Sequence, residues 1–290
     1  MLAISNLNKT YPNGVRALNG VNLQIKTGMF GLLGPNGAGK SSLMRTIATL
    51  QDADEGSIQF DDLNVLQQKE GMRSVLGYLP QEFGVYPNSS AEDLLTHLAI
   101  LKGITDSRIR KETVERLLEL TNLAKHRKKN LGGYSGGMKQ RFGIAQALLA
   151  HPKIIIVDEP TAGLDPDERD RFHNLLSQIG ENVTVILSTH IVSDVSDLCQ
   201  DMAIINNGRV LVQKSPLLAI ESMKGKVWRK IFDKTEIENV QAKFKVISSR
   251  LTHGKVMLRV YGDAMPDNGF EATAPDLEDV YFSYIRSYVQ

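Results

Sequence analysis

Short runs of consecutive apolar residues recur along much of the chain. The clearest occupy 29–33, 154–157 and 183–188, and the run at 154–157 is almost entirely β-branched. An unbroken run of this kind is typical of a parallel strand that is buried on both faces. A stretch with helical spacing at 167–179 separates two of these runs. The pattern therefore predicts an α/β fold built on a parallel sheet.

The periodicity differs on either side of the first buried run. Residues 2–7 and 18–25 alternate between apolar and polar positions, which predicts two antiparallel strands before the run at 29–33. From 88 to 132 the spacing is helical, with a capped helix that begins near Ser90 and a second helix at 108–120. This block is predicted to be a helical insertion between β-rich parts.

The pattern changes again from about residue 214. Short strands are predicted at 227–232, 244–248 and 256–261, followed by a terminal helix at 276–288. One face of that helix carries an apolar stripe: Leu277, Val280, Tyr281, Tyr284 and Ile285. The stripe is expected to pack against this small domain, with a docking face as the alternative. The chain is thus predicted to consist of a large domain, 1–213, and a small α+β domain, 214–290.

The first buried run leads into a glycine-rich stretch that fits the phosphate-loop pattern G-x-x-x-x-G-K-[ST]. It reads Gly34, Pro35, Asn36, Gly37, Ala38, Gly39, Lys40, Ser41 and Ser42, and a helical pattern follows it. Glycines allow several backbone N–H groups to point at one anion, and the helix N-terminus favours negative charge. Lys40 can neutralise outer phosphates, and the Ser41 hydroxyl can hold Mg²⁺.

Polar residues follow the other predicted strands. Asp158 and Glu159 end the run at 154–157, Gln81 ends a run at 75–79, and His190 follows the run at 183–188. Ligands on α/β sheets bind at the carboxyl ends of the strands. Because successive residues at a strand end project differently, Asp158 can face a metal while Glu159 faces an attacking water.

A second candidate anion site lies at Ser135-Gly136-Gly137. Ser135 is a good helix N-cap, and two glycines in a first turn are costly unless a ligand must approach the backbone closely. Tyr11 lies near the start of the chain. An aromatic ring there can stack on a nucleotide base, or it can simply pack beside its own turn. The sequence position of Tyr11 does not distinguish between these two roles.

Composition narrows the functional classes. The chain has 290 residues, 34 Lys and Arg against 33 Asp and Glu, and a formal net charge of +1, so no nucleic-acid partner is expected. A single cysteine, Cys199, excludes an internal disulfide framework. With no signal-peptide pattern and no apolar run of about 18–20 residues, we expect a cytoplasmic protein that reaches a membrane only through a partner.

Together these motifs resemble the nucleotide-binding subunit of an ABC transporter, over roughly residues 1–213. The glycine-rich stretch 34–42 matches Walker A, and 154–158 matches Walker B with Glu159 following. The remaining matches are Tyr11 with the A-loop, Gln81 with the Q-loop, Ser135-Gly136-Gly137 with the signature motif, Asp165 with the D-loop and His190 with the switch histidine. The signature departs from LSGGQ, because Tyr134 and Met138 replace its first and fifth residues.

The resemblance implies a RecA-like P-loop NTPase core with an antiparallel β subdomain and a helical subdomain at about 89–135. It also implies a Mg²⁺-dependent ATPase that forms a head-to-tail dimer, homo- or heteromeric, with two ATP molecules between the subunits. In this resemblance Lys40 binds phosphates, and Ser41, Gln81 and Asp158 bind the metal. Glu159 is the implied general base, and His190 is implied to contact the γ-phosphate. Two further implied roles concern the dimer: closure of the partner's site by Ser135, Gly136 and Gly137, and a position at the dimer seam for Asp165.

The C-terminal stretch 274–281 resembles the "PSLEDVF" ending of ATPases that serve ABC-2 type exporters of drugs, polysaccharides or sodium. The implied partners are integral membrane permease subunits on other chains, with the ATPase peripheral on the inner face of the cell membrane. The alternative is a regulatory ABC ATPase that acts on a soluble partner. A GTPase is excluded because Asn8-Lys9-Thr10-Tyr11 fails the N-K-x-D pattern and precedes the phosphate loop.

Overall fold

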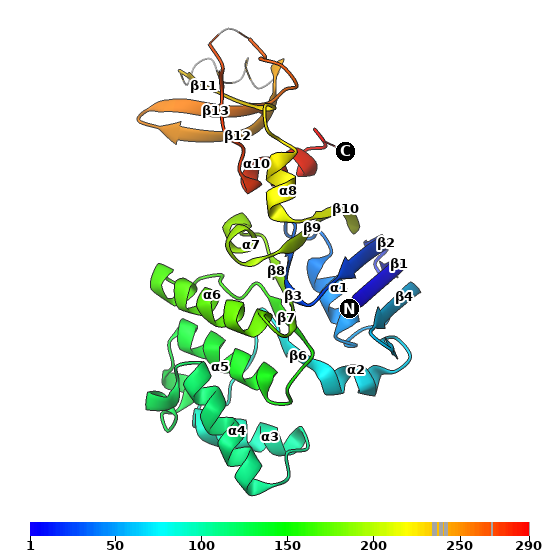
Figure 1. Cartoon of the computed structure of the whole chain (residues 1–290), viewed down its shortest axis with the longest axis vertical. Helices are drawn as coiled ribbons and strands as arrows, with labels where there is room; N and C mark the ends of the chain where they lie inside the picture. The colour runs from blue at the N-terminus through cyan, green and yellow to red at the C-terminus, as the bar shows by residue number, and fades with distance from the viewer. Residues whose placement is uncertain (234–236, 238–239, 241–242, 268, 290) are drawn as a thin grey trace.

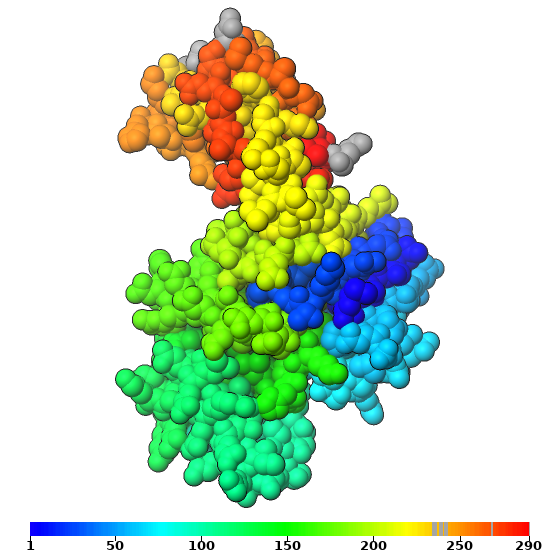
Figure 2. Space-filling model, viewed as in Figure 1, coloured from blue at the N-terminus to red at the C-terminus, as the bar shows by residue number. Residues whose placement is uncertain are grey.

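The fold is built from three β-sheets and the helices that cover them (Figure 1). The structure is a computed structural model, and it describes residues 1–233, 237, 240, 243–267 and 269–289. A helical region forms one end of the elongated molecule, and a small antiparallel sheet lies at the other end (Figure 1). Figure 2 shows the same elongated shape in a space-filling view.

The central sheet has the strand order β10-β9-β3-β8-β7-β6. Its strands from β6 to β9 are all parallel, and only β10 runs antiparallel, which confirms the predicted parallel sheet. Every residue of β3, β7 and β8 is buried, as the unbroken apolar runs predict. The strands are β3 (Gly28–Leu33), β6 (Leu76–Leu79), β7 (Ile154–Asp158), β8 (Thr184–Thr189), β9 (Asp201–Asn206) and β10 (Arg209–Lys214).

An antiparallel sheet covers one face of the central sheet. Its order is β2-β1-β4-β5, and β1 pairs with β2 as the alternating pattern predicts. Side chains from both sheets share one core with α1, for example Phe30, Ile156 and Met44. The elements on this side are β1 (Leu2–Thr10), β2 (Arg16–Ile25), α1 (Lys40–Ile47), β4 (Glu55–Phe60), β5 (Leu63–Asn64) and α2 (Lys69–Val75).

The opposite face of the central sheet packs on helices. Alternate residues of the same strands, such as Leu33 and Val157, pack with Phe172 of α6 and Val195 of α7. The helical insertion has a core of its own, formed between α3, α4 and α5. These elements are α3 (Ala91–Leu101), α4 (Ser107–Leu120), two 3₁₀ turns (Ala124–His126 and Leu131–Gly133), α5 (Gly136–Leu148), α6 (Pro166–Gly180) and α7 (Val192–Leu198).

The C-terminal part forms the third sheet, with the order β12-β13-β11-β14. The three predicted strands appear as β11 (Val227–Phe232), β12 (Lys245–Thr252) and β13 (Lys255–Tyr261), and β14 (Glu271–Ala272) adds a short edge. Two helices join this sheet to the rest, α8 (Pro216–Glu221) and α10 (Leu277–Ile285). The domain boundary after residue 213 stays a prediction.

The contacts of α10 differ from those expected. The sequence predicts that its stripe packs against the small domain, with a docking face as the alternative. In the structure, Val280 and Tyr284 also share a core with Val192 of α7 and Met202 of β9. The helix also contacts β12, so it lies between the third sheet and the large domain. An apolar stripe shows that a helix face is buried but not which element buries it, which is why the prediction is incomplete.

Candidate functional site

The predicted strand-end residues meet at one edge of the central sheet. Gln81 follows β6, Glu159 follows β7, His190 follows β8 and the phosphate loop follows β3, and these four strands are neighbours in the order β3-β8-β7-β6. Their carboxyl ends border a cavity of about 400 Å³. The cavity is lined by Tyr11, by 35–42 of the loop, by Gln81, Glu159 and Asn207, and by 15–17 of the N-terminal sheet.

The phosphate loop is shaped by close backbone packing. Gly39 has φ +105°, and a Cβ there would lie 2.4 Å from the carbonyl oxygen of Ala17. A Cβ on Gly34 would lie 2.4 Å from the carbonyl oxygen of Ile205. Both positions therefore require glycine. Helix α1 then begins at Lys40 without a side-chain cap, so its first turn presents backbone N–H groups to the cavity as an anion site requires.

The hairpin turn between β9 and β10 supports this loop. Asn207 and Gly208 both have positive φ, as a tight two-residue hairpin turn requires. The N–H of Gly208 donates to the carbonyl oxygen of Ala38 at 2.9 Å. This contact depends on β9 lying beside β3 in the central sheet.

Lys40 is buried in a polar pocket. Its Nζ donates to the carbonyl oxygen of Gly34 at 2.8 Å and lies 3.3 Å from that of Pro35. The same atom lies 3.3 Å from Oε1 of Glu159, and both side chains are only 6% exposed. A buried ammonium group needs such partners, because it has lost its water.

Glu159 joins two strand ends. Its Oε2 lies 2.6 Å from Nδ1 of His190, and its backbone N–H donates to the carbonyl oxygen of Ser188 at 2.8 Å. Its backbone has φ +50°, a conformation that costs a non-glycine residue about 1–3 kcal/mol and occurs often at functional sites. The carboxylate is therefore held between the ammonium group of Lys40 and the imidazole of His190.

Asp158 fits a cation ligand. It is 4% exposed, and its Oδ1 has no hydrogen-bond partner among the described residues. Burial, together with the nearby carboxylate of Asp158, raises the pKa of Tyr78. A buried carboxylate oxygen that lacks a partner suits an oxygen-seeking divalent ion such as Mg²⁺. Ser41 and Gln81 line the cavity of about 400 Å³ and carry neutral oxygens, and Asp158 directly precedes Glu159, which also lines it.

Tyr11 lies beside the phosphate loop. Its hydroxyl is 3.0 Å from Oγ of Ser42 and donates to Oε1 of Gln51 at 3.0 Å. Its backbone closes its own turn, with its N–H donating to Val15. The ring thus borders the cavity, and base stacking stays a prediction.

Two candidate segments, 135–137 and the position of Asp165, lie away from this cavity within one chain. Ser135 caps α5 and accepts a hydrogen bond from the N–H of Met138 at 3.2 Å, while Gly136 is exposed and Gly137 packs against Glu168. Asp165 caps α6 and is exposed. None of them is among the residues that line the cavity. Gly34 and Asp158 adjoin lining residues in the sequence, and His190 contacts the lining residue Glu159, but these three are not among the lining residues themselves.

Comparison with known proteins decides the family. Residues 18–162 match the family described as "ABC transporter". The chain belongs to that family. It is 34% identical over 213 residues to the linearmycin resistance ATP-binding protein LnrL of Bacillus subtilis, with 73% of this chain and 68% of LnrL covered. It is also 29% identical over 308 residues to the probable multidrug ABC transporter ATP-binding protein YbhF of Escherichia coli.

The match to YbhF covers 98% of this chain, which spans about half (52%) of YbhF. A methionine import ATP-binding protein is among the other relatives. The dimeric structure of the ATP-binding cassette MJ0796 bound to ADP and Pi is similar to this ABC cassette, with a TM-score of 0.67 and 27% identity. That match covers 74% of this chain and 98% of the MJ0796 chain. The RecA-like P-loop NTPase core is confirmed by these relatives.

Sequence reasoning missed a buried cluster behind the ABC site. Asp194 of α7 is bound there by Thr161, Arg169, His173 and Thr189. A carboxylate four positions after His190 is visible in the sequence, but nothing in its spacing shows that α6 and α7 lie side by side.

None of the described helices combines the length and the hydropathy that crossing a lipid bilayer requires.

Proposed function

We propose that this ABC cassette binds ATP with Mg²⁺ and hydrolyses it to drive a membrane exporter formed by other chains. The observation that carries the proposal is the position of Glu159. Its carboxylate lies at the mouth of the phosphate loop, 3.3 Å from Nζ of Lys40 and 2.6 Å from Nδ1 of His190. A carboxylate placed there can orient a water molecule toward the terminal phosphate.

Each residue of the site has a task in this reaction. Lys40 and the loop amides hold the phosphates, which replace Glu159 as the anionic partner of the ammonium group. Glu159 is then free to accept a proton from the attacking water, while His190 holds the carboxylate and contacts the γ-phosphate. Ser41, Asp158 and Gln81 would hold Mg²⁺, which supplies positive charge to the phosphate oxygens.

The site is proposed to be complete only in a dimer. Ser135, Gly136 and Gly137 begin α5 at a distance from the cavity of their own chain, yet they offer a helix N-terminus that suits a phosphate. In a head-to-tail dimer of this chain, or of this chain with a related one, that N-terminus closes the partner's site. Asp165, exposed at the start of α6, then lies at the seam.

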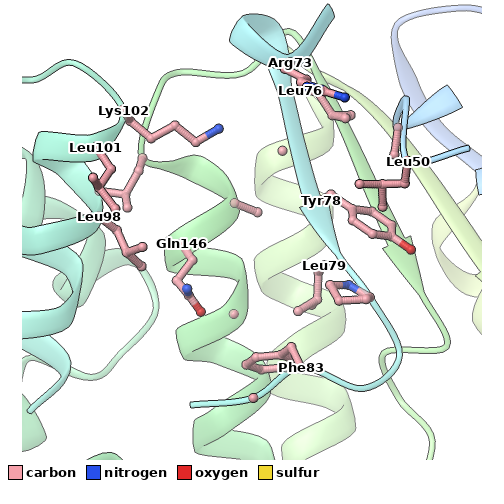
Figure 3. A pocket seen from close by; sticks show the side chains of 17 residues that line it. Leu50, Arg73, Leu76, Tyr78, Leu79, Phe83, Leu98, Leu101, Lys102 and Gln146 are labelled. Carbon is pink, nitrogen blue, oxygen red and sulfur yellow. The ribbon is translucent and has the colours of Figure 1, made fainter. Parts of the chain in front are cut away.

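A second cavity is the proposed contact for the membrane subunit. It has a volume of about 470 Å³ and lies between α3, α5 and β6 (Figure 3). Its walls are largely apolar, and Leu101 of α3 and the nearby Leu50 are 70% and 60% exposed. The occupant we propose is a short helix of the permease. Phe83 and Gly84 line the cavity two and three positions after Gln81, so one segment connects it with the ATP site.

Export is the direction that the tail at 274–281 and the resistance relatives favour. The test is co-purification of the tagged chain from detergent-solubilised membranes. We expect an integral membrane protein to co-purify with the wild type and to be lost with Leu101→Asp. Ile109→Asp is the matched control, since Ile109 is 56% exposed on α4 and does not line the cavity. Capture of a soluble protein alone would favour the regulatory alternative.

A further inference from the structure

The carboxylate of Asp194, on α7, is completely buried and does not line the ATP cavity. Its Oδ2 accepts a hydrogen bond from the Thr161 hydroxyl at 2.6 Å and another from the Thr189 hydroxyl at 3.4 Å. Its Oδ1 accepts from Nε of Arg169 at 2.9 Å and lies 2.9 Å from Nε2 of His173. Four groups from the loop after β7, from the end of β8 and from α6 thus converge on one buried carboxylate.

This carboxylate is charged at neutral pH. Burial acts to raise the pKa of Asp194, but the hydrogen bonds from His173, Thr161 and Arg169 outweigh burial and hold the pKa below its ordinary value. A buried charge is stable only with such a complete set of donors, and losing one partner is costly. The cluster therefore fixes the segments that supply the donors.

Two of these donors are next to the residues proposed to act on ATP. Thr161 follows Glu159 by two positions, and Thr189 directly precedes His190. The Thr189 hydroxyl also accepts a hydrogen bond from the N–H of Ile191 at 2.9 Å. The side chain of Asp194 therefore binds a residue close to each partner of the 2.6 Å contact between Glu159 and His190.

The third segment leads to the proposed dimer seam. Arg169 and His173 lie on α6, the helix that Asp165 caps. Arg169 is bound to Asp194 through two nitrogens, and its NH2 group also donates to Oγ of Ser193 at 2.6 Å. Asp194 thus links α6, the helix that begins at the proposed seam, with the loops that carry Glu159 and His190.

We propose that Asp194 is a positioning residue for ATP hydrolysis, holding the loops after β7 and β8 so that Glu159 and His190 stay paired. The inference rests on the proposed function, because it needs Glu159 to act in hydrolysis. In this proposal Asp194 makes no contact with ATP. Replacing Asp194 should therefore change the turnover of ATP rather than the affinity for nucleotide.

The experiment compares Asp194→Asn and Thr161→Val in the intact chain. Thr161→Val removes one hydrogen bond to Asp194 while it keeps the shape of the side chain. We expect kcat to fall about tenfold in Thr161→Val and further in Asp194→Asn, because small misplacements of reacting groups are costly. The dissociation constant of a fluorescent ATP analogue should stay within about threefold of the wild type.

Thr121→Val is the matched control. Thr121 is also buried, and its hydroxyl donates to the carbonyl oxygen of Leu117 at 2.8 Å, away from the ATP site. Thr121→Val should lower the midpoint of thermal unfolding, as Thr161→Val does, and should leave kcat unchanged. Equal kcat values for Thr161→Val and Thr121→Val would overturn the inference. If Asp194→Asn does not fold, Thr161→Val still decides the result.

A double variant separates this inference from the proposed function. In a Glu159→Gln background, Thr161→Val should lower the residual rate by less than about twofold, because the group that it positions is already lost. A full tenfold effect in that background would contradict the inference. Wild-type turnover in Glu159→Gln alone would instead contradict the proposed function, whatever the Thr161 variants show.

Discussion

Nζ of Lys40 lies 3.3 Å from Oε1 of Glu159, although the two residues come from different strand ends. The cation of the phosphate loop and the proposed general base thus lie within ion-pair distance of each other. This contact places the carboxylate beside the group that is proposed to hold the phosphates.

Replacing Lys40 should weaken ATP binding strongly. Lys40→Ala removes a buried charged donor, and such a bond contributes about 1.5–3 kcal/mol, so affinity should fall about tenfold to hundredfold. Equilibrium binding of a fluorescent ATP analogue measures this. Lys69→Ala is the control, since Lys69 pairs with Asp52 at an exposed site. An unchanged affinity in Lys40→Ala would contradict the phosphate-loop assignment.

Variants of Tyr11 test whether its ring stacks on the base of ATP. Tyr11→Ala should lower ATP affinity about tenfold, because stacking of a base on an aromatic ring contributes about 1–3 kcal/mol. Tyr11→Phe keeps the ring and loses only the hydroxyl contacts with Ser42 and Gln51, so its affinity should stay close to that of the wild type. Titration with ATP of both variants distinguishes the roles. Equal losses in the two variants would show that the hydroxyl, and not the ring, matters.

Gly39 should tolerate no side chain. Gly39→Ala places a Cβ 2.4 Å from the carbonyl oxygen of Ala17 and adds the cost of φ +105°. Gly103→Ala is the control, because Gly103 has φ +88° and a Cβ added there would meet no atom within 4 Å. The control should lower the free energy of unfolding by about 1 kcal/mol, and Gly39→Ala by at least about 2 kcal/mol more. Urea unfolding measures both, and equal losses would contradict the close packing of Gly39 against Ala17.

Two arginines contact α10 in different surroundings. Arg259 pairs with Asp279, whose side chain is 1% exposed, and the hydrogen bond raises the pKa of Arg259. Arg250 pairs with Glu278 at an exposed site. Arg259→Ala should lower the free energy of unfolding by about 3 kcal/mol, because it leaves a buried carboxylate unpaired. Arg250→Ala should cost less than about 1 kcal/mol. Similar losses in urea unfolding would show that the buried pair does not anchor α10.

Much of the ATP site follows from the sequence because it depends on strand ends. Buried runs identify the parallel strands, and polar residues that follow them must gather at one edge. That reasoning places Gln81, Asp158, Glu159 and His190 near the phosphate loop, and the structure brings Glu159 into contact with both Lys40 and His190.

The rest depends on which helices become neighbours. The donors to Asp194 come from three segments, and their meeting requires α6 and α7 to pack together on the sheet. The apolar stripe of α10 is visible in the sequence, but its packing against Val192 and Met202 is not. Periodicity describes one helix or strand at a time, so it does not predict which elements contact one another.

The most direct test of the central claim is the turnover of Glu159→Gln. The account predicts that this variant binds ATP, hydrolyses it at least about a hundredfold more slowly and accumulates as an ATP-bound dimer, measured by phosphate release and light scattering. Glu181→Gln, an exposed change at the end of α6, should behave as the wild type. Near-normal hydrolysis by Glu159→Gln would contradict the account.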